Sequence, residues 1–168
     1  MADECPEIDV PVLRRAAMDC LARREHSQLE LTQKLRRKYS DAQHSLIQQV
    51  IAELQADGLQ SDARFVESFV RYRKSRGFGL LHIRADLQAR GIDDELLQAH
   101  LHRDDDDWQA IASELTERKL GGRGLGFQSR EHRRLVRFLQ SRGFTTDQIR
   151  CAVDPHLDSA IATESDND

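Results

Sequence analysis

The residues best suited to metal chemistry are the histidines and a run of four aspartates at 104–107, and neither set has metal-site spacing. His100 and His102 are two positions apart, so a helix would direct them to different sides and they could not share one ion. The aspartate run lacks the alternating oxygen ligands and the central glycine of a calcium loop. It precedes an apolar helical pattern, and we interpret it as an acidic helix start, which the helix dipole favours. The sequence predicts no metal and no cofactor.

Patterns for catalysis or phosphate binding are also weak. The glycine-rich segment 121–126 contains G-x-G, but it follows a helical pattern rather than a strand, and no Gly-Lys-Ser/Thr follows it. We interpret this segment as a flexible linker. No spacing singles out a nucleophile with its base or a pair of catalytic carboxylates. The cysteines Cys5, Cys20 and Cys151 form no CxxC pair, which fits a reducing cytoplasm. We therefore expect a cytoplasmic protein that is not an enzyme.

Basic side chains form the pattern that carries the most chemical information. The segment 62–91 has seven Lys and Arg residues against three acids, and the predicted helix 128–142 places four arginines at i, i+3, i+4 and i+7, which is one helical stripe. The apolar side of the predicted helix 62–76 is expected to hold Phe65, Val66, Phe69, Val70 and Tyr72. We expect an anionic partner to be contacted by Arg71, Arg73, Lys74, Arg76, Arg84, Arg130, Arg133, Arg134 and Arg137. Ordinary solvated helix faces are the alternative interpretation.

The distribution of charge agrees with an anionic partner. Residues 1–9 carry four acids and residues 154–168 carry five, with no Lys or Arg in either stretch. Since the whole chain has a net charge of -4, removing these nine acids leaves +5 for residues 10–153. A basic body between acidic ends can attract an anionic surface even though the whole chain is acidic.

Apolar residues recur at helical spacing through almost the whole chain, and strand-like alternation is absent. Ser27 and Glu30 have the spacing of a capping box, and Gly58, Gly77, Gly91 and Gly143 follow periodic segments, where helices end. We predict helices at 11–24, 28–38, 44–57, 62–76, 80–90, 94–102, 105–119, 128–142 and 146–154.

An internal repeat organises these helices. Leu31 and Leu35 have counterparts 52 residues later, and again 52 residues after that. The series that starts at Leu31 continues with Ile83 and Leu135, and the series that starts at Leu35 continues with Leu87 and Leu139. Arg90-Gly91-Ile92 likewise corresponds to Arg142-Gly143-Phe144, whereas the first copy has Lys38-Tyr39 in place of Arg-Gly, so its turn must be built differently. We predict an all-α fold of three tandem three-helix repeats that form an elongated, curved array.

The predicted organisation has five parts. They are an acidic N-terminal segment at 1–10, repeats at 11–60, 61–103 and 104–154, and an acidic disordered tail at 155–168. Arrays of this kind bind along one extended surface rather than inside a pocket.

Several segments together resemble the RecX family. The most specific is DARFVESFVRYRKSRGFGLLHIRADLQARGI at 62–92, preceded by Gly58-Leu59. The first repeat, with Ser27-Gln-Leu-Glu-Leu31 and Lys34-Leu35, fits as well. In the third repeat, the similar segments are Asp107-Trp108, Arg118-Lys119 and Phe138-Leu139-Gln-Ser-Arg-Gly143-Phe144. The resemblance covers about residues 12–153, and the acidic stretch after Pro155 lies outside the family pattern.

The resemblance implies tandem three-helix repeats and a regulator of the RecA recombinase. Such a protein associates with the RecA filament on single-stranded DNA and inhibits its recombinase, ATPase and co-protease activities, which affects recombination, DNA repair and the SOS response. We expect it to act as a monomer, with weak direct DNA contact and no membrane association, and to lie along the filament groove. Two alternatives stay open: a single-stranded DNA-binding helical protein, and a helical-repeat adaptor for an unrelated protein.

Overall fold

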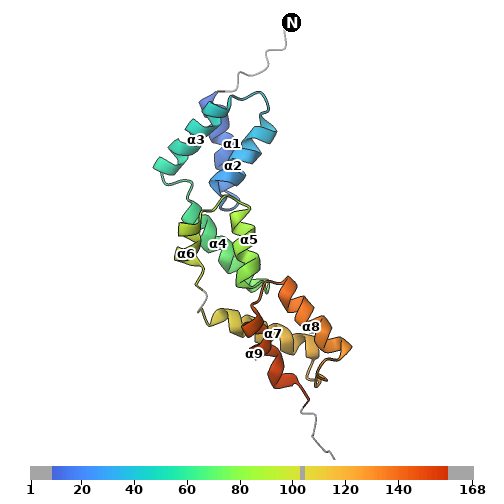
Figure 1. The fold of residues 1–168 in the computed structure, drawn as a ribbon. Coiled ribbons are helices and arrows are strands. Elements are labelled where there is room, and N and C mark those ends of the chain that lie inside the picture. The colour runs from blue at the N-terminus through green and yellow to red at the C-terminus, as the bar shows by residue number, and fades with distance from the viewer. Residues whose placement is uncertain (1–8, 103–104, 159–168) are drawn as a thin grey trace, which may run out of the picture. The chain divides into compact units, whose positions relative to one another are not determined.

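The computed structural model describes residues 9–102 and 105–158, and Figure 1 follows their path. Within these ranges the chain forms nine α-helices, a short 3-10 turn and no strand. They are α1 (Val10–Leu21), α2 (Gln28–Lys38), α3 (His44–Ala56), α4 (Asp62–Ser75), α5 (Leu80–Gln88), α6 (Asp94–His100), α7 (Asp107–Leu120), α8 (Arg130–Ser141), α9 (Thr146–Val153) and the turn Asp154–His156. The all-α prediction is confirmed, and every predicted helix ends within three residues of an observed one.

The chain divides into two compact units, and the division runs through α4 and α5. The first unit extends to Arg71 and includes Ala85–Leu101. The second unit consists of Tyr72–Arg84 and the chain from His102 onward. The predicted tail at 155–168 lies largely outside the described residues, which end at 158.

The core of the first unit lies among α1, α2 and α3, which all contact one another. Its fully buried members come from the periodic apolar positions of each helix: Leu13, Ala17, Leu31, Leu35, Ile47, Val50, Ile51 and Leu54. Helix α1 starts where Asp9 accepts a hydrogen bond from the amide of Val12, and Pro11 occupies a position where no amide donor is needed.

Ser27 connects α2 to the segment that follows α5 within the same unit. Its Oγ accepts a hydrogen bond from the amide of Glu30 and donates one of 2.8 Å to the carbonyl of Arg90. The Glu30 carboxylate pairs with Arg24 at 2.9 Å and with Arg90 at 3.0 Å. The predicted capping box is therefore correct for Ser27, but Glu30 binds two arginines instead of completing the box.

The second unit has its core among α7, α8 and α9. It contains Ala112, Leu115, Leu120, Leu125, Leu135, Leu139, Phe144, Ile149, Ala152 and Val153. Leu125 is only 2% exposed, its amide donates to the carbonyl of His156 at 2.9 Å, and its carbonyl accepts from the amide of Asp158 at 3.0 Å. The interpretation of 121–126 as a flexible linker is therefore wrong for its second half, because Leu125 is held in the core.

Two glycine turns meet backbone to backbone in the second unit. The amide of Gly79 donates to the carbonyl of Arg142 at 2.8 Å, and the amide of Leu81 donates to the carbonyl of Gly143 at 3.0 Å. A Cβ at Gly79 would lie 2.5 Å from the Gly143 oxygen, and Gly143 itself has φ +87°. Only glycine permits both the close approach and the left-handed backbone here.

The repeat is visible in burial as well as in sequence. All six leucine and isoleucine positions of the 52-residue series are at most 6% exposed: Leu31, Leu35, Ile83, Leu87, Leu135 and Leu139. Gly91 and Gly143 both have positive φ, whereas Tyr39 ends its helix at φ -126°. The first copy therefore builds its turn differently, as its sequence predicts.

One predicted core position is wrong. Tyr72 is 60% exposed, whereas Phe65 and Val66 are buried and Phe69 and Val70 are half-buried.

None of the helices in the described ranges combines the length and apolar character needed to cross a bilayer.

Candidate functional site

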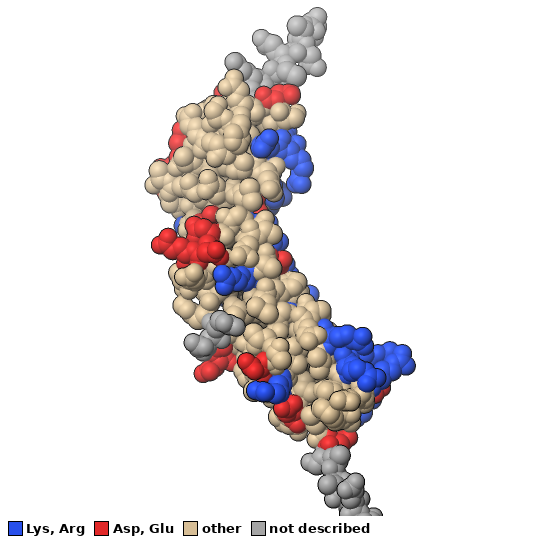
Figure 2. Space-filling model, in the orientation of Figure 1, with Lys and Arg blue, Asp and Glu red and all other residues tan. Residues whose placement is uncertain are grey.

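Helix α8 carries a continuous basic stripe on its solvent side. Ser129 begins the helix, accepting a hydrogen bond from the amide of His132 at 3.0 Å, and Leu135 and Leu139 fix its buried side. All four predicted arginines are exposed on the opposite side: Arg130, Arg133, Arg134 and Arg137. Figure 2 shows basic side chains gathered over the region of α8. We call these four residues the α8 stripe.

The charges of the α8 stripe are not neutralised by ion pairs with other described residues. Arg133 donates to the carbonyl of Gln128, and Arg137 Nε donates to the carbonyl of Arg133 at 3.3 Å. Arg130 and Arg134 have no side-chain hydrogen bond or ion pair within the described ranges. Carbonyl oxygens orient a guanidinium but do not cancel its charge, so the stripe can bind carboxylates or phosphates.

The predicted contact residues of the middle repeat fall into two groups. Arg71 on α4, Arg76 after α4 and Arg84 on α5 are exposed. Arg73 and Lys74 are half-buried and have partners within the second unit. Of the nine predicted residues, only Arg71 belongs to the first unit.

Lys74 is held between two acids and an aromatic ring. It forms ion pairs with Asp105 and, at 3.0 Å, with Asp107, and its Nζ lies 4.2 Å from the centre of the Trp108 ring. Burial alone would lower the pKa of Lys74, but the hydrogen bonds that its Nζ donates to Asp105 and Asp107 outweigh burial and raise the pKa. For Asp105, burial alone would raise the pKa, but bonding to Lys74 lowers it. The charge of Lys74 is thus used inside the unit.

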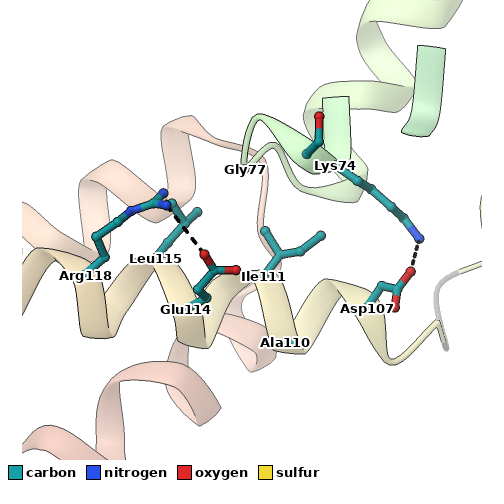
Figure 3. A pocket seen from close by; sticks show the side chains of 9 residues that line it. Lys74, Gly77, Asp107, Ala110, Ile111, Glu114, Leu115 and Arg118 are labelled. Carbon is teal, nitrogen blue, oxygen red and sulfur yellow. Dashed lines mark hydrogen bonds and ion pairs between the residues drawn. The ribbon is translucent and has the colours of Figure 1, made fainter. Parts of the chain in front are cut away.

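Figure 3 shows the shallow pocket that lies beside this cluster, with the Lys74–Asp107 ion pair at one end. The pocket has a volume of about 320 Å³, and its other end carries the exposed pair Arg118–Glu114 at 3.5 Å. Its apolar wall contains Ile111 and Leu115, and Gly77 approaches Leu115 closely. These groups do not form a nucleophile with a base, so the pocket provides no catalytic arrangement.

Phe78 is enclosed by cations rather than exposed. The guanidinium carbons of Arg73 and Arg142 lie 4.8 and 4.6 Å from its ring centre, and the ring of His82 stacks on it at 4.5 Å. Arg142 also donates to the carbonyl of Arg76 at 2.9 Å. The sequence pattern did not identify Arg142 as a member of this cluster.

Phe127 differs from Phe78 because it is 65% exposed. It precedes α8, and its ring centre lies 5.6 Å from that of His132.

Within the described residues, no three His, Cys, Asp or Glu side chains come together in a way that could hold a metal ion.

Comparison with known proteins identifies matches along most of the chain. The model of the second three-helix domain of RecX matches residues 61–101, and that of the third three-helix domain matches residues 105–153. The regulatory protein RecX of Pseudomonas entomophila is 41% identical over 143 residues, covering 84% of this chain and 90% of that protein. The regulatory protein RecX of Halorhodospira halophila is 40% identical over 154 residues, covering 92% of this chain and 90% of that protein.

Solved structures support the same fold. The crystal structure of RecX from Lactobacillus salivarius has a TM-score of 0.72 to this chain with 23% sequence identity, covering 88% of this chain and 96% of that one. A second crystal structure of a regulatory protein RecX has a TM-score of 0.68 and 18% identity, covering 86% of this chain and 73% of that one.

Proposed function

Because this chain belongs to the RecX family of regulatory proteins, we propose that it binds the RecA filament on single-stranded DNA and inhibits RecA. The proposed inhibition covers the recombinase, ATPase and co-protease activities of RecA. Such a protein would regulate recombination, DNA repair and the SOS response in the cytoplasm, without catalysing a reaction itself.

The observation that supports this proposal most directly is the α8 stripe. Its four arginines are exposed and lack ion pairs with described residues, so they are available to a partner's carboxylates or phosphates. A protein lodged in the filament groove through such contacts would obstruct incoming duplex DNA and the repressor that the filament helps to cleave. It would also resist the subunit motions that ATP turnover requires.

The test compares two double variants in a RecA ATPase assay on single-stranded DNA. Arg133→Glu with Arg137→Glu reverses half of the α8 stripe, and Arg36→Glu with Arg37→Glu makes the same charge change on exposed positions of α2. We expect strong inhibition by wild type well below one molecule per RecA. Charge reversal at a complementary interface should raise the half-inhibitory concentration about tenfold or more for the α8 variant only.

Equal inhibition by the wild type and the α8 variant would remove the stripe from the mechanism. Absence of inhibition by the wild type, together with failure to co-sediment with RecA filaments, would instead favour an adaptor for another protein. Circular dichroism of both variants would verify that the helices are intact.

Direct competition for single-stranded DNA is a second candidate function, favoured by the exposed Phe127 next to the stripe. An aromatic ring beside a basic track stacks on bases, and its loss costs about 1–3 kcal/mol per base. If this candidate is correct, Phe127→Ala will weaken binding to naked DNA, that binding will fall steeply with salt, and excess single-stranded DNA will abolish the inhibition of RecA.

A further inference from the structure

A second pocket of about 320 Å³ lies against α8, and its character differs from that of the first. Its floor is apolar and consists of Leu120, Leu125, Leu135 and Phe138. Its rim is basic and includes Lys119, Arg123 and Arg134. We call it the α8 pocket. Arg134 belongs both to this pocket and to the α8 stripe.

The rim of the α8 pocket is open to negative charge. Lys119 Nζ lies 4.6 Å from the ring centre of Phe138, and Arg123 Nε donates to the carbonyl of Leu120 at 3.2 Å. Neither cation has an ion pair with a described residue, and Arg134 has no side-chain partner there. The one acid in the lining is the exposed Glu131. This combination fits a segment with an aliphatic anchor followed by carboxylates.

The chain itself delivers such a segment to the edge of the pocket. The backbone on either side of Leu157 pairs with Leu125, which is part of the pocket floor: the carbonyl of His156 and the amide of Asp158 bond to it at 2.9 and 3.0 Å. A methyl group at Gly124, another lining residue, would meet the carboxylate of Asp158. Residues 159–168 therefore continue from a point already fixed at the pocket.

The composition of residues 159–168 complements the pocket. The segment reads SAIATESDND, with no Lys or Arg, three acids and one large aliphatic residue, Ile161. Ile161 follows Asp158 by three positions, a span of about 10 Å when extended. The acids Glu164, Asp166 and Asp168 all follow Ile161.

We propose that residues 159–168 dock intramolecularly on the α8 pocket. Ile161 occupies the apolar floor, and the acids that follow it face Arg123 and Arg134. Because Arg134 also belongs to the α8 stripe, the docked segment competes with an anionic partner. This regulatory consequence rests on the proposed function, whereas the docking itself does not.

The expected size of the competition follows from tethering. A short flexible tether gives an effective concentration of about 1 mM, so a segment with an intrinsic dissociation constant of about 0.1 mM would be docked about ten times out of eleven. Removing the segment should then lower the half-inhibitory concentration about tenfold.

Docking is tested by NMR on the full-length ¹⁵N-labelled chain. At low ionic strength, the amides of residues 159–168 should differ in chemical shift from a free peptide of the same sequence and show positive heteronuclear NOEs. At about 1 M salt, where the Debye length falls to about 3 Å, the chemical-shift differences and the heteronuclear NOEs should both decrease. Arg134→Glu and Ile161→Asp should each release the segment. Arg130→Glu is the matched control, because it reverses a charge on the same helix outside the pocket lining.

Free-peptide shifts and low NOEs in the wild type at low salt would overturn the docking proposal, as would equal effects of Arg134→Glu and Arg130→Glu. In the RecA assay, a chain ending at Asp158 should inhibit about tenfold more strongly than the full chain. Unchanged potency would overturn the competitive role. If neither chain inhibits RecA, the proposed function fails, and the NMR result still decides the docking.

Discussion

Replacing Lys74 with methionine should destabilise the second unit without disturbing its helix. Methionine keeps a long unbranched side chain over Trp108 but removes the charge that binds the ring and the two acids. The Lys74 side chain is 17% exposed and that of Asp105 is 32% exposed, so both charges are partly withdrawn from water. Loss of Lys74 therefore leaves a half-buried carboxylate without its cation.

The magnitude follows from the individual contacts. A partly desolvated cation–π contact contributes about 1 kcal/mol, and the pair with Asp105 contributes about 1–2 kcal/mol because its members are mostly shielded. The pair with Asp107 contributes little, because that carboxylate is 68% exposed. We expect Lys74→Met to lower the free energy of unfolding by about 2–3 kcal/mol.

Urea unfolding followed by tryptophan fluorescence measures this change directly. Trp108 is the single tryptophan of the chain, is 1% exposed and contacts Lys74, so its signal reports on the second unit. With a slope of about 2 kcal/mol per molar urea, the midpoint should fall by about 1 M or more. Arg71→Met is the control, because Arg71 is exposed on the same helix and has no side-chain partner among the described residues. A Lys74→Met midpoint equal to that of Arg71→Met would refute the reasoning.

Two further predictions concern single residues. Gly143→Ala should lower the free energy of unfolding by about 3 kcal/mol or more, because Gly143 has φ +87° and its Cβ would lie 2.3 Å from the His82 amide nitrogen. Gly122→Ala is the control: Gly122 has φ +78° but lies in open space, so the loss should be about 1–2 kcal/mol. Equal urea midpoints for the two variants, detected by fluorescence, would contradict this. Burial lowers the pKa of His26 from its usual value of 6.5. Below about pH 6.5 the unfolded chain therefore binds a proton at His26 that the folded chain does not. The free energy of unfolding should then fall, as the pH is lowered, by up to about 1.4 kcal/mol per pH unit. His26→Gln should remove that slope in urea titrations monitored by circular dichroism, and an unchanged slope would exclude His26 as its source.

Local patterns predicted the helices and the α8 stripe because both depend on periodicity within one helix. The four arginines of the α8 stripe share one side of the helix whatever packs on the other side, so their common exposure needs no knowledge of tertiary structure. The positions of Leu135 and Leu139 determined which side would be buried. The repeat boundaries at 11–60, 61–103 and 104–154 stay predictions from the sequence pattern.

Tertiary contacts account for what the sequence pattern missed. Lys74 looks like any solvent-facing helix cation until Asp105 and Trp108, about thirty positions later, pack against it. Leu125 lies in a glycine-rich segment typical of linkers, and its backbone partners at His156 and Asp158 are equally remote in sequence. Tyr72 follows the apolar side of α4 but lies near the end of the helix, where the described residues leave it 60% exposed.

The internal partners of the basic residues separate structural cations from candidate contact residues. Lys74 stabilises the fold through Trp108, and Arg73 and Arg142 do so through Phe78. A partner would have to displace these contacts before it could use their charges, which costs part of the binding free energy. The α8 stripe carries no such cost, because its arginines bind only carbonyl oxygens or no described group. Substitutions in the stripe should therefore weaken partner binding at unchanged stability, whereas Lys74→Met should lower the stability of the second unit.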